Sequence, residues 1–363
     1  FAGPPPSDGV TASSDAVLRG PTTVDGEDEE SDDGGPVLLL VSGLGCGSDS
    51  PVDARTGSSL ALRREMLLDY LTDPSRRSGG ASVCRVIVAG GGVTPPVVAE
   101  EEPDKENVSQ DRKNYNSVAD TNSKRNKAEA DLASNRAAFA LRELDLYLSE
   151  LLGGGVPVDY VPGWHDPTNA NWPQRPLHSC LLPLSCGYVD LFGRGTNPYE
   201  AILGGGGDGE NAGGVRVLGS DGLNVADLRR FLSKEEGEDA EANEEDEDGG
   251  TTAAAASCID ALNRTLEYRH MAPTGPDSLP TFPSFESDPF VLKSSPGVYF
   301  AGNCEEFETR LVDGEGKEVD GGKEGQSATR LVCVPSFALT GEVVLVKLKS
   351  LECEVVSFND ASL

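Results

Sequence analysis

Between Val37 and Val161 the sequence alternates short apolar runs with longer segments of helical periodicity. Strands are predicted at 37–42, 83–89 and 156–161, and helices at 58–72 and 127–152. Leucines between 141 and 151 recur at helical spacing, and the glycines at 153–155 end the second helix. Because a β-α-β-α-β order needs crossover connections, it predicts a largely parallel sheet with helices packed on its faces.

Toward the C-terminus the alternation of strands and helices gives way to a series of short β-rich runs. A further strand is predicted at 215–219, followed by a short helix that Asn224 caps and that runs to Phe231, and by a helix over 253–270. Short β-rich runs then occur at 290–292, 298–301, 307–312, 329–334, 343–348 and 352–358. The predicted fold class is therefore α/β, with the body completed by antiparallel strands.

Several segments lack the apolar residues that a packed core requires. Residues 1–35 combine Pro, Gly, Ser and acidic residues and are predicted to be a disordered linker, with the folded domain spanning 36–363. Disordered insertions are predicted near 100–126, 204–214, 233–250 and 313–326, where added loop length costs little. The start on Phe1 favours a chain that lacks its true N-terminus.

The formal net charge is −31, and two acidic runs carry much of it. Asp25–Asp33 holds seven acidic residues and Glu235–Asp248 holds ten, which leaves about −14 for the rest of the chain. Binding to phosphate backbones needs clustered cations. We therefore expect any contact with DNA to be indirect or weak.

Membrane spans and bound metals are not expected. No apolar run approaches the ~20 residues that cross a bilayer. The eight cysteines contain no CxxC pair that would begin a zinc site, and they are predicted to be reduced thiols. We expect neither a metal nor a cofactor.

Two segments follow predicted strands and could carry chemistry. Ser42 to Gly47 resembles a dinucleotide-binding turn, but the fingerprint G-x-G-x-x-G fails because Ser48 occupies the third glycine position. The second segment is Gly163-Trp164-His165-Asp166, after the strand at 156–161. Strand ends of this kind are where α/β proteins place their sites.

The second segment resembles the Gly-Asn-His-Asp element of calcineurin-like metallophosphoesterases, in which Asn binds metal while His and Asp assist phosphoryl transfer. That resemblance implies two packed sheets flanked by helices. Trp164 replaces the Asn beside His165 and Asp166. The other ligand positions would fall where neither Asp nor His stands, on Gly43, Gly45, Gly91, Asn303 and Glu305. Because a two-metal site needs several converging His and carboxylate ligands, we interpret all eight positions as vestigial and expect no catalytic residues.

Segments spread in order over residues 36–358 are similar to the small (B) subunits of replicative DNA polymerases, those of DNA polymerase delta above all. They include Val156–Asp159, Asp166–Asn169, Pro176–His178, Thr196–Tyr199, Gly219–Asp227, Arg269–Asp277 and Val298–Asn303. The resemblance implies a nuclear, non-catalytic accessory subunit in DNA replication and repair synthesis. It would bridge the C-terminal cysteine-rich module of the catalytic subunit to a further accessory subunit, and it would have an N-terminal OB domain not visible in this chain.

The sequence leaves two alternative functions. One is an active metal-dependent phosphodiesterase that uses His165 and Asp166, and the other is a nucleotide-binding domain on the Gly43 turn. Trp164 and Trp172 lie on a Pro-rich loop beside the second segment. Tryptophan is common both in cores and in binding hot spots, so either could be a core residue or a partner contact.

Overall fold

The computed structural model describes residues 35–48, 59–73, 83–94, 115–204, 213–232, 256–284, 287–319 and 328–359, with the backbone alone for 115–133. The predicted linker at 1–35 and the insertion at 233–250 lie almost wholly outside these ranges, as does most of 204–214. None of the described helices is long and apolar enough to cross a membrane.

The first sheet is built around four parallel strands. These are β1 (Val37–Val41), β2 (Val83–Ala89), β3 (Val158–Val161) and β4 (Phe192–Arg194), and the two antiparallel strands β10 (Glu342–Lys347) and β11 (Cys353–Ser357) extend the β1 edge. The strand order is β11-β10-β1-β2-β3-β4. Between β3 and β4 lie two single 3-10 turns, η3 (Ser179–Leu181) and η4 (Ser185–Gly187). The predicted parallel sheet is confirmed.

The second sheet has the order β5-β6-β7-β9-β8. Its strands are β5 (Tyr199–Leu203), β6 (Val215–Ser220), β7 (Val298–Cys304), β8 (Glu308–Val312) and β9 (Thr329–Pro335), and the one-turn helix α5 (Phe337–Thr340) follows β9. β7 pairs in parallel with both β6 and β9, whereas β5 and β8 are antiparallel to their neighbours. The expectation of antiparallel strands holds for β8, β10 and β11 but was wrong for β7 and β9. β7 is parallel to β6 because the helices α3 (Leu223–Arg229) and α4 (Cys258–Glu267) supply a crossover between them.

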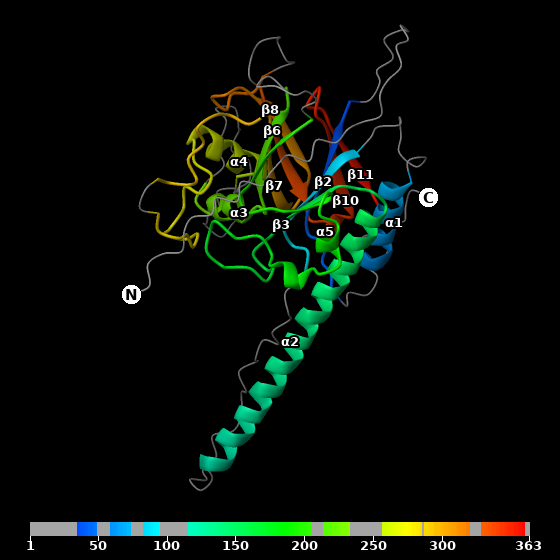
Figure 1. The fold of residues 1–363 in the computed structure, drawn as a ribbon. Coiled ribbons are helices and arrows are strands. Elements are labelled where there is room, and N and C mark those ends of the chain that lie inside the picture. The colour runs from blue at the N-terminus through cyan, green and yellow to red at the C-terminus, as the bar shows by residue number, and fades with distance from the viewer. Residues whose placement is uncertain are drawn as a thin grey trace, which may run out of the picture.

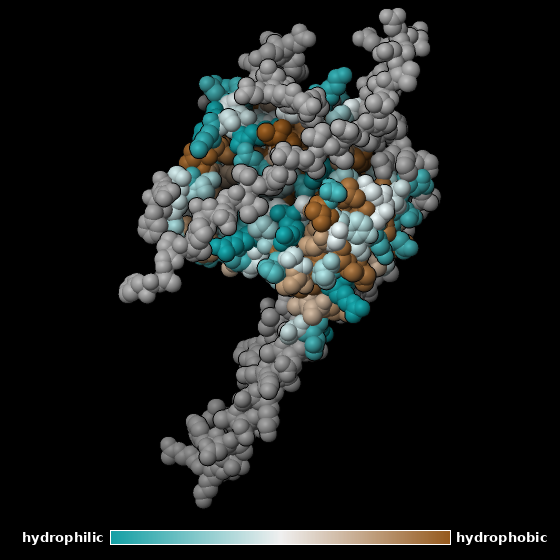
Figure 2. Space-filling model, viewed as in Figure 1, coloured by the Kyte–Doolittle hydropathy of each residue, from teal (hydrophilic) through white to brown (hydrophobic). Residues whose placement is uncertain are grey.

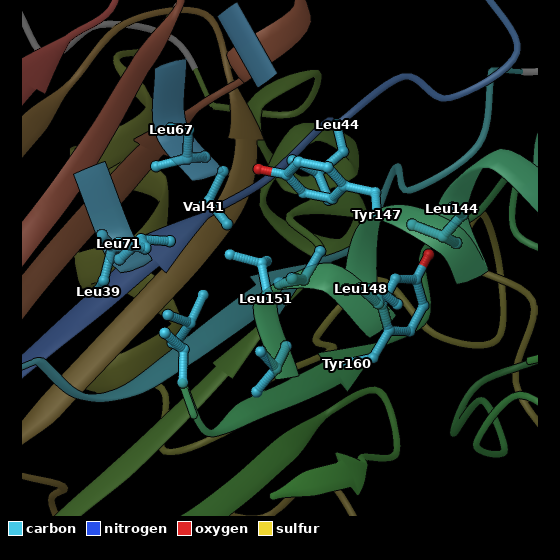
Figure 3. Close-up of a cluster of buried hydrophobic side chains, with 14 of the residues drawn as sticks. Leu39, Val41, Leu44, Leu67, Leu71, Leu144, Tyr147, Leu148, Leu151 and Tyr160 are labelled. Atoms are coloured by element: carbon cyan, nitrogen blue, oxygen red, sulfur yellow. The ribbon is translucent and has the colours of Figure 1, made fainter. Parts of the chain in front are cut away.

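Helices cover the outer face of each sheet (Figure 1). α1 (Leu60–Thr72) and α2 (Tyr115–Gly153) pack on the first sheet, and α3 (Leu223–Arg229) and α4 (Cys258–Glu267) pack on the second. Leu39 and Val41 of β1 face the leucines of α1 and α2, as Figure 3 shows. Their neighbours Leu38 and Leu40 point the other way, into the core between the sheets. This alternation follows from the period of two along a strand.

Helix bounds differ from the predictions where local signals were ambiguous. Helix α2 begins at Tyr115 rather than near 127, because neither Gly nor Pro interrupts 115–152, so residues 115–126 are helical and not a loop. Helix α4 is shorter than 253–270, since Ser257 caps its first turn. Asn224 does not cap α3: Gly222 holds that position with φ 90°, and the buried Asn224 lies inside the helix.

Two further segments differ from the predictions. Residues 290–292 form no strand but a single bridge between Val291 and His270. Residues 313–319, predicted to be part of an insertion, form a turn in which the Asp313 carboxylate accepts hydrogen bonds from the backbone N–H groups of Glu315 and Lys317. Residues 320–326 of that insertion lie outside the described ranges.

Candidate functional site

The strand ends of the two sheets meet at one place in the structure. Gly43, after β1, donates its N–H to the carbonyl of Gly90, after β2, at 2.9 Å. Asn303, near the end of β7, donates its side-chain amide to Ala89 O of β2 at 3.3 Å and to Asp221 O, after β6, at 2.9 Å. Because the carboxyl ends of parallel strands share one edge of a sheet, residues far apart in sequence converge there.

Glycine backbone fills three of the positions that the resemblance assigns to the metal site, Gly43, Gly45 and Gly91. A Cβ added to Gly91 would lie 2.9 Å from Gly43 Cα and 2.7 Å from Asn303 Oδ1. A Cβ added to Gly163 would lie 2.8 Å from Gly91 N. Gly43 and Gly91 also have φ of 65° and 68°, which side-chain-bearing residues rarely adopt. Main chain packs directly on main chain here, so these positions are closed as well as lacking ligand side chains.

The Gly43 turn does not present free amides to a phosphate. Its N–H groups at Gly43, Gly45 and Cys46 donate to the carbonyls of residues 90, 91 and 92 at 2.9 to 3.1 Å. Gly47 N donates to Glu143 Oε2 of α2 at 2.7 Å. A phosphate-binding turn needs backbone N–H groups that point at the ligand. These are already bonded, which argues against the nucleotide-binding reading.

Asp166 is buried and holds two strand ends together. Its Oδ2 accepts a hydrogen bond from Gly163 N at 2.7 Å, and its Oδ1 accepts one from Val93 N at 3.2 Å. Burial raises the pKa of Asp166 to about 6, the nearby Asp221 carboxylate adds to this, and the donated hydrogen bonds oppose it. The Asp166 carboxylate thus joins the ends of β2 and β3.

Asp221 likewise accepts hydrogen bonds at a strand end, here in the second sheet. This role was not predicted from the sequence. Its Oδ2 accepts from Trp164 N at 3.0 Å, and its Oδ1 accepts from Asn197 Nδ2 at 2.8 Å and from Leu223 N at 3.3 Å. Burial raises its pKa. The one available signal was an Asp-Gly pair directly after a predicted strand, the same setting as the Gly163 segment.

The remaining candidate residues separate into exposed and buried positions. His165 is exposed and makes no hydrogen bond or ion pair with any residue that the structure describes, although Asp166 beside it is buried. Glu305 is exposed and lies 3.5 Å from Arg229. Trp164 is 43% exposed whereas Trp172 is fully buried against Phe290.

The site does not fit a pair of catalytic metal ions. Among the described residues, no three His, Cys, Asp or Glu side chains lie close enough together to hold a metal ion. The buried carboxylates of Asp166 and Asp221 each already accept hydrogen bonds from at least two donors. A two-metal centre needs several converging ligands with free lone pairs. The described strand ends therefore do not supply the ligand set of a two-metal centre.

Fold and site together define a two-sheet α/β protein in which the strand ends are closed by backbone contacts and buried carboxylates. The chain belongs to the DNA polymerase alpha/epsilon B-subunit family, whose model matches residues 38–309. It is similar to DNA polymerase delta subunit 2 of Drosophila melanogaster, with 37% identity over 64% of this chain and 44% of that protein. It is also similar to the DNA polymerase delta small subunit of Oryza sativa subsp. japonica, with 30% identity over 89% of this chain and 59% of that protein.

The chain spans about half the length of the curated relatives it matches, and a third one, the DNA polymerase delta small subunit of Arabidopsis thaliana, is 36% identical over 60% of this chain and 40% of its own. A solved structure, TT1561 of Thermus thermophilus, aligns over 89% of this chain and 99% of its own with a TM-score of 0.33 and 11% identity. That likeness is too weak to carry an argument.

Proposed function

We propose that this chain is a non-catalytic accessory subunit of the DNA polymerase delta complex, acting in DNA replication and repair synthesis. The family membership and the relatives named as small subunits of that polymerase support the complex. The single structural observation behind the non-catalytic role is the closed site, where Gly91 packs on Gly43. A subunit whose strand ends are rigidly joined suits a scaffold, since binding surfaces need backbone held in place.

The proposal extends to partners and location. The chain would contact the C-terminal cysteine-rich module of the catalytic subunit and a further accessory subunit, and it would work in the nucleus. The net charge of −31 supports contact with DNA through those partners, because like charges repel a phosphate backbone. The two acidic runs at 25–33 and 235–248 lie outside the described residues.

An active phosphodiesterase based on His165 and Asp166 is not favoured. The Asp166 carboxylate points inward to two backbone N–H groups, while the His165 side chain is exposed. A general acid or base must reach the same reacting group as its partner residues. The two side chains do not provide this.

Co-purification tests the proposal. The chain would be co-expressed with a tagged catalytic subunit of DNA polymerase delta from the same organism, with and without the C-terminal cysteine-rich module. We expect retention with the intact catalytic subunit and loss when the module is deleted. Absence of the chain from the eluate, while a full-length small subunit expressed in parallel is retained, would refute the proposed contact.

A metal assay tests the non-catalytic part separately. Purified chain would be incubated with Mn²⁺, desalted, and assayed for bound metal and for hydrolysis of bis(p-nitrophenyl) phosphate. We expect no stoichiometric metal and the same rate for the wild type and for Asp166→Asn. Manganese-dependent turnover that disappears in His165→Ala would establish the enzyme instead.

A further inference from the structure

One face of helix α2 carries exposed apolar side chains beside two arginines. Phe139 is 66% exposed and Leu146 is 46% exposed. They are seven residues apart, so they lie two turns apart on the same side of the helix, about 10 Å along its axis. Exposed Arg136 and Arg142 lie three residues before and after Phe139. We call Arg136, Phe139, Arg142 and Leu146 the α2 stripe.

The stripe does not face the protein's own core. Leu144, Leu148 and Leu151 of α2 are buried against the first sheet, which uses the opposite side of the helix. Among the described residues, neither Arg136 nor Arg142 makes a hydrogen bond or an ion pair, whereas Glu143 beside them is bonded to Arg64 and Gly47. The positive charge of the stripe is therefore not neutralised by Glu143.

The segment around η4 continues the stripe toward the end of the helix. The Asp145 carboxylate accepts the backbone N–H of Leu184 at 2.9 Å, which holds the exposed Leu184 against α2 at the residue before Leu146. Gly153 is seven residues beyond Leu146 and so lies on the same side of α2. A Cβ added to Gly153 would lie 3.4 Å from the Tyr188 hydroxyl, so Tyr188 also lies on that side. Figure 2 shows apolar surface gathered where α2 meets the body. Contiguous exposed apolar surface of this kind marks interaction sites.

The geometry points to an acidic amphipathic helix of a partner protein as the occupant: we propose that such a helix docks on the α2 stripe. Its apolar residues at seven-residue spacing would cover Phe139 and Leu146, and its flanking carboxylates would meet Arg136 and Arg142. Helices recognise one another through anchors at this spacing. Opposite charges across the contact select the partner and speed its association.

Charge and composition favour this occupant over others. The two exposed arginines, Arg136 and Arg142, favour a partner segment that carries carboxylates, because opposite charges attract across a contact. The chain's own acidic runs, Asp25–Asp33 and Glu235–Asp248, contain no apolar residue larger than Ala, so they offer nothing to cover Phe139. The inference does not depend on which complex the chain joins.

Two synthetic helical peptides test the inference by fluorescence anisotropy on the full chain. Both carry leucines at seven-residue spacing on an Ala/Gln background, one with flanking Glu and the other with flanking Lys. We expect the Glu peptide to bind at least tenfold more tightly at low salt. The Arg136→Glu/Arg142→Glu variant should reverse that preference, and salt near 0.5 M should weaken it, because exposed charges are screened.

Matched variants separate a specific contact from a general effect. Arg175→Glu/Lys349→Glu makes the same change in net charge at exposed positions elsewhere and should keep the preference for the Glu peptide. Phe139→Ser/Leu146→Ser should lose binding of both peptides, while Ile202→Ser/Leu339→Ser, at similarly exposed apolar positions, should not. Thermal unfolding of every variant should match the wild type.

Several outcomes would overturn the inference. Equal binding of the two peptides, binding of neither, or an unchanged preference in Arg136→Glu/Arg142→Glu would each do so. A wild-type dimer that Phe139→Ser/Leu146→Ser converts to a monomer in light scattering would show that a second copy occupies the stripe. Preferential binding to vesicles of anionic lipid would assign it to a membrane. Co-purification with the catalytic subunit is a separate measurement, so its failure would leave this test standing.

Discussion

The Asp221 carboxylate accepts a hydrogen bond from the backbone N–H of Trp164 at 3.0 Å and thereby ties the exit of β6 in one sheet to the exit of β3 in the other. Asp166 makes the corresponding bonds within the first sheet. Two buried carboxylates at the strand ends thus hold the chain together.

Asp221→Ala should lower the free energy of unfolding by about 2–4 kcal/mol, since it leaves the buried donor of Asn197 and the partly buried donors of Trp164 and Leu223 without an acceptor. Urea unfolding followed by circular dichroism measures the change. Glu305→Gln, at an exposed position, is the control and should stay within about 0.5 kcal/mol of the wild type. Equal effects of the two substitutions would show that Asp221 does not join the sheets.

Asp166 should make stability depend on pH. Its folded-state pKa of about 6 lies above the ordinary value of 3.8, so the folded form holds the proton more tightly, and this contribution is lost as the pH rises through about 6. Between pH 5 and 7 the wild type should lose about 1 kcal/mol relative to Asp166→Asn, which cannot titrate. Urea titrations of both proteins at each pH measure the difference. A constant difference would contradict the raised pKa.

Gly91→Ala should destabilise the protein by about 2–4 kcal/mol, because its Cβ would meet Gly43 Cα at 2.9 Å and its φ of 68° is unfavourable for alanine. Gly155→Ala is a matched control: φ is 78°, but nothing lies within 4 Å of the added Cβ, so only the backbone cost of about 1 kcal/mol remains. Thermal unfolding compares the two. Similar losses in both variants would mean that the strand ends are not closely packed.

Trp172→Ala should cost about 3–5 kcal/mol, since it empties a fully buried volume against Phe290. Trp164→Ala removes a side chain that is 43% exposed and should cost less than about 1 kcal/mol. Denaturant unfolding measures both values. If Trp164→Ala proved as damaging as Trp172→Ala, the tryptophan at 164 would be a core residue and not a surface one.

Glu143→Gln should loosen the turn after β1. The Glu143 carboxylate accepts Gly47 N at 2.7 Å and pairs with the buried Arg64, so neutralising it should cost about 1–2 kcal/mol. Hydrogen exchange of the Gly47 amide should become faster by roughly tenfold, which equals about 1.4 kcal/mol. Glu150→Gln, exposed on the same helix, should leave that rate unchanged.

Local sequence signals predicted most elements because they need only neighbouring residues. The apolar runs of β1, β2 and β3 and the helical segment of α1 follow directly from period and propensity. The early start of α2 at Tyr115 was missed because the polar sequence before residue 127 has no apolar stripe, although it contains no residue that ends a helix.

The sequence predicted which residues lie at the candidate site but did not predict that hydrogen bonds and backbone packing close it. The sequence located Gly43, Gly91, Asp166 and Asn303 at strand ends and showed that ligand side chains are missing. It did not indicate that Asp221 closes the site, because a lone Asp after a strand has no periodicity and its partners Trp164 and Asn197 are distant in the chain.

The sequence by itself determined the order of most strands and helices, though not β4 and β5, and the absence of the metal-ligand residues, since both depend on residue type and spacing alone. Only the tertiary structure decided that the strand ends of two sheets meet, that Gly91 packs on Gly43, and that the carboxylates of Asp166 and Asp221 are occupied by backbone donors. Those facts depend on long-range packing and burial, which place groups in contact independently of their distance along the chain.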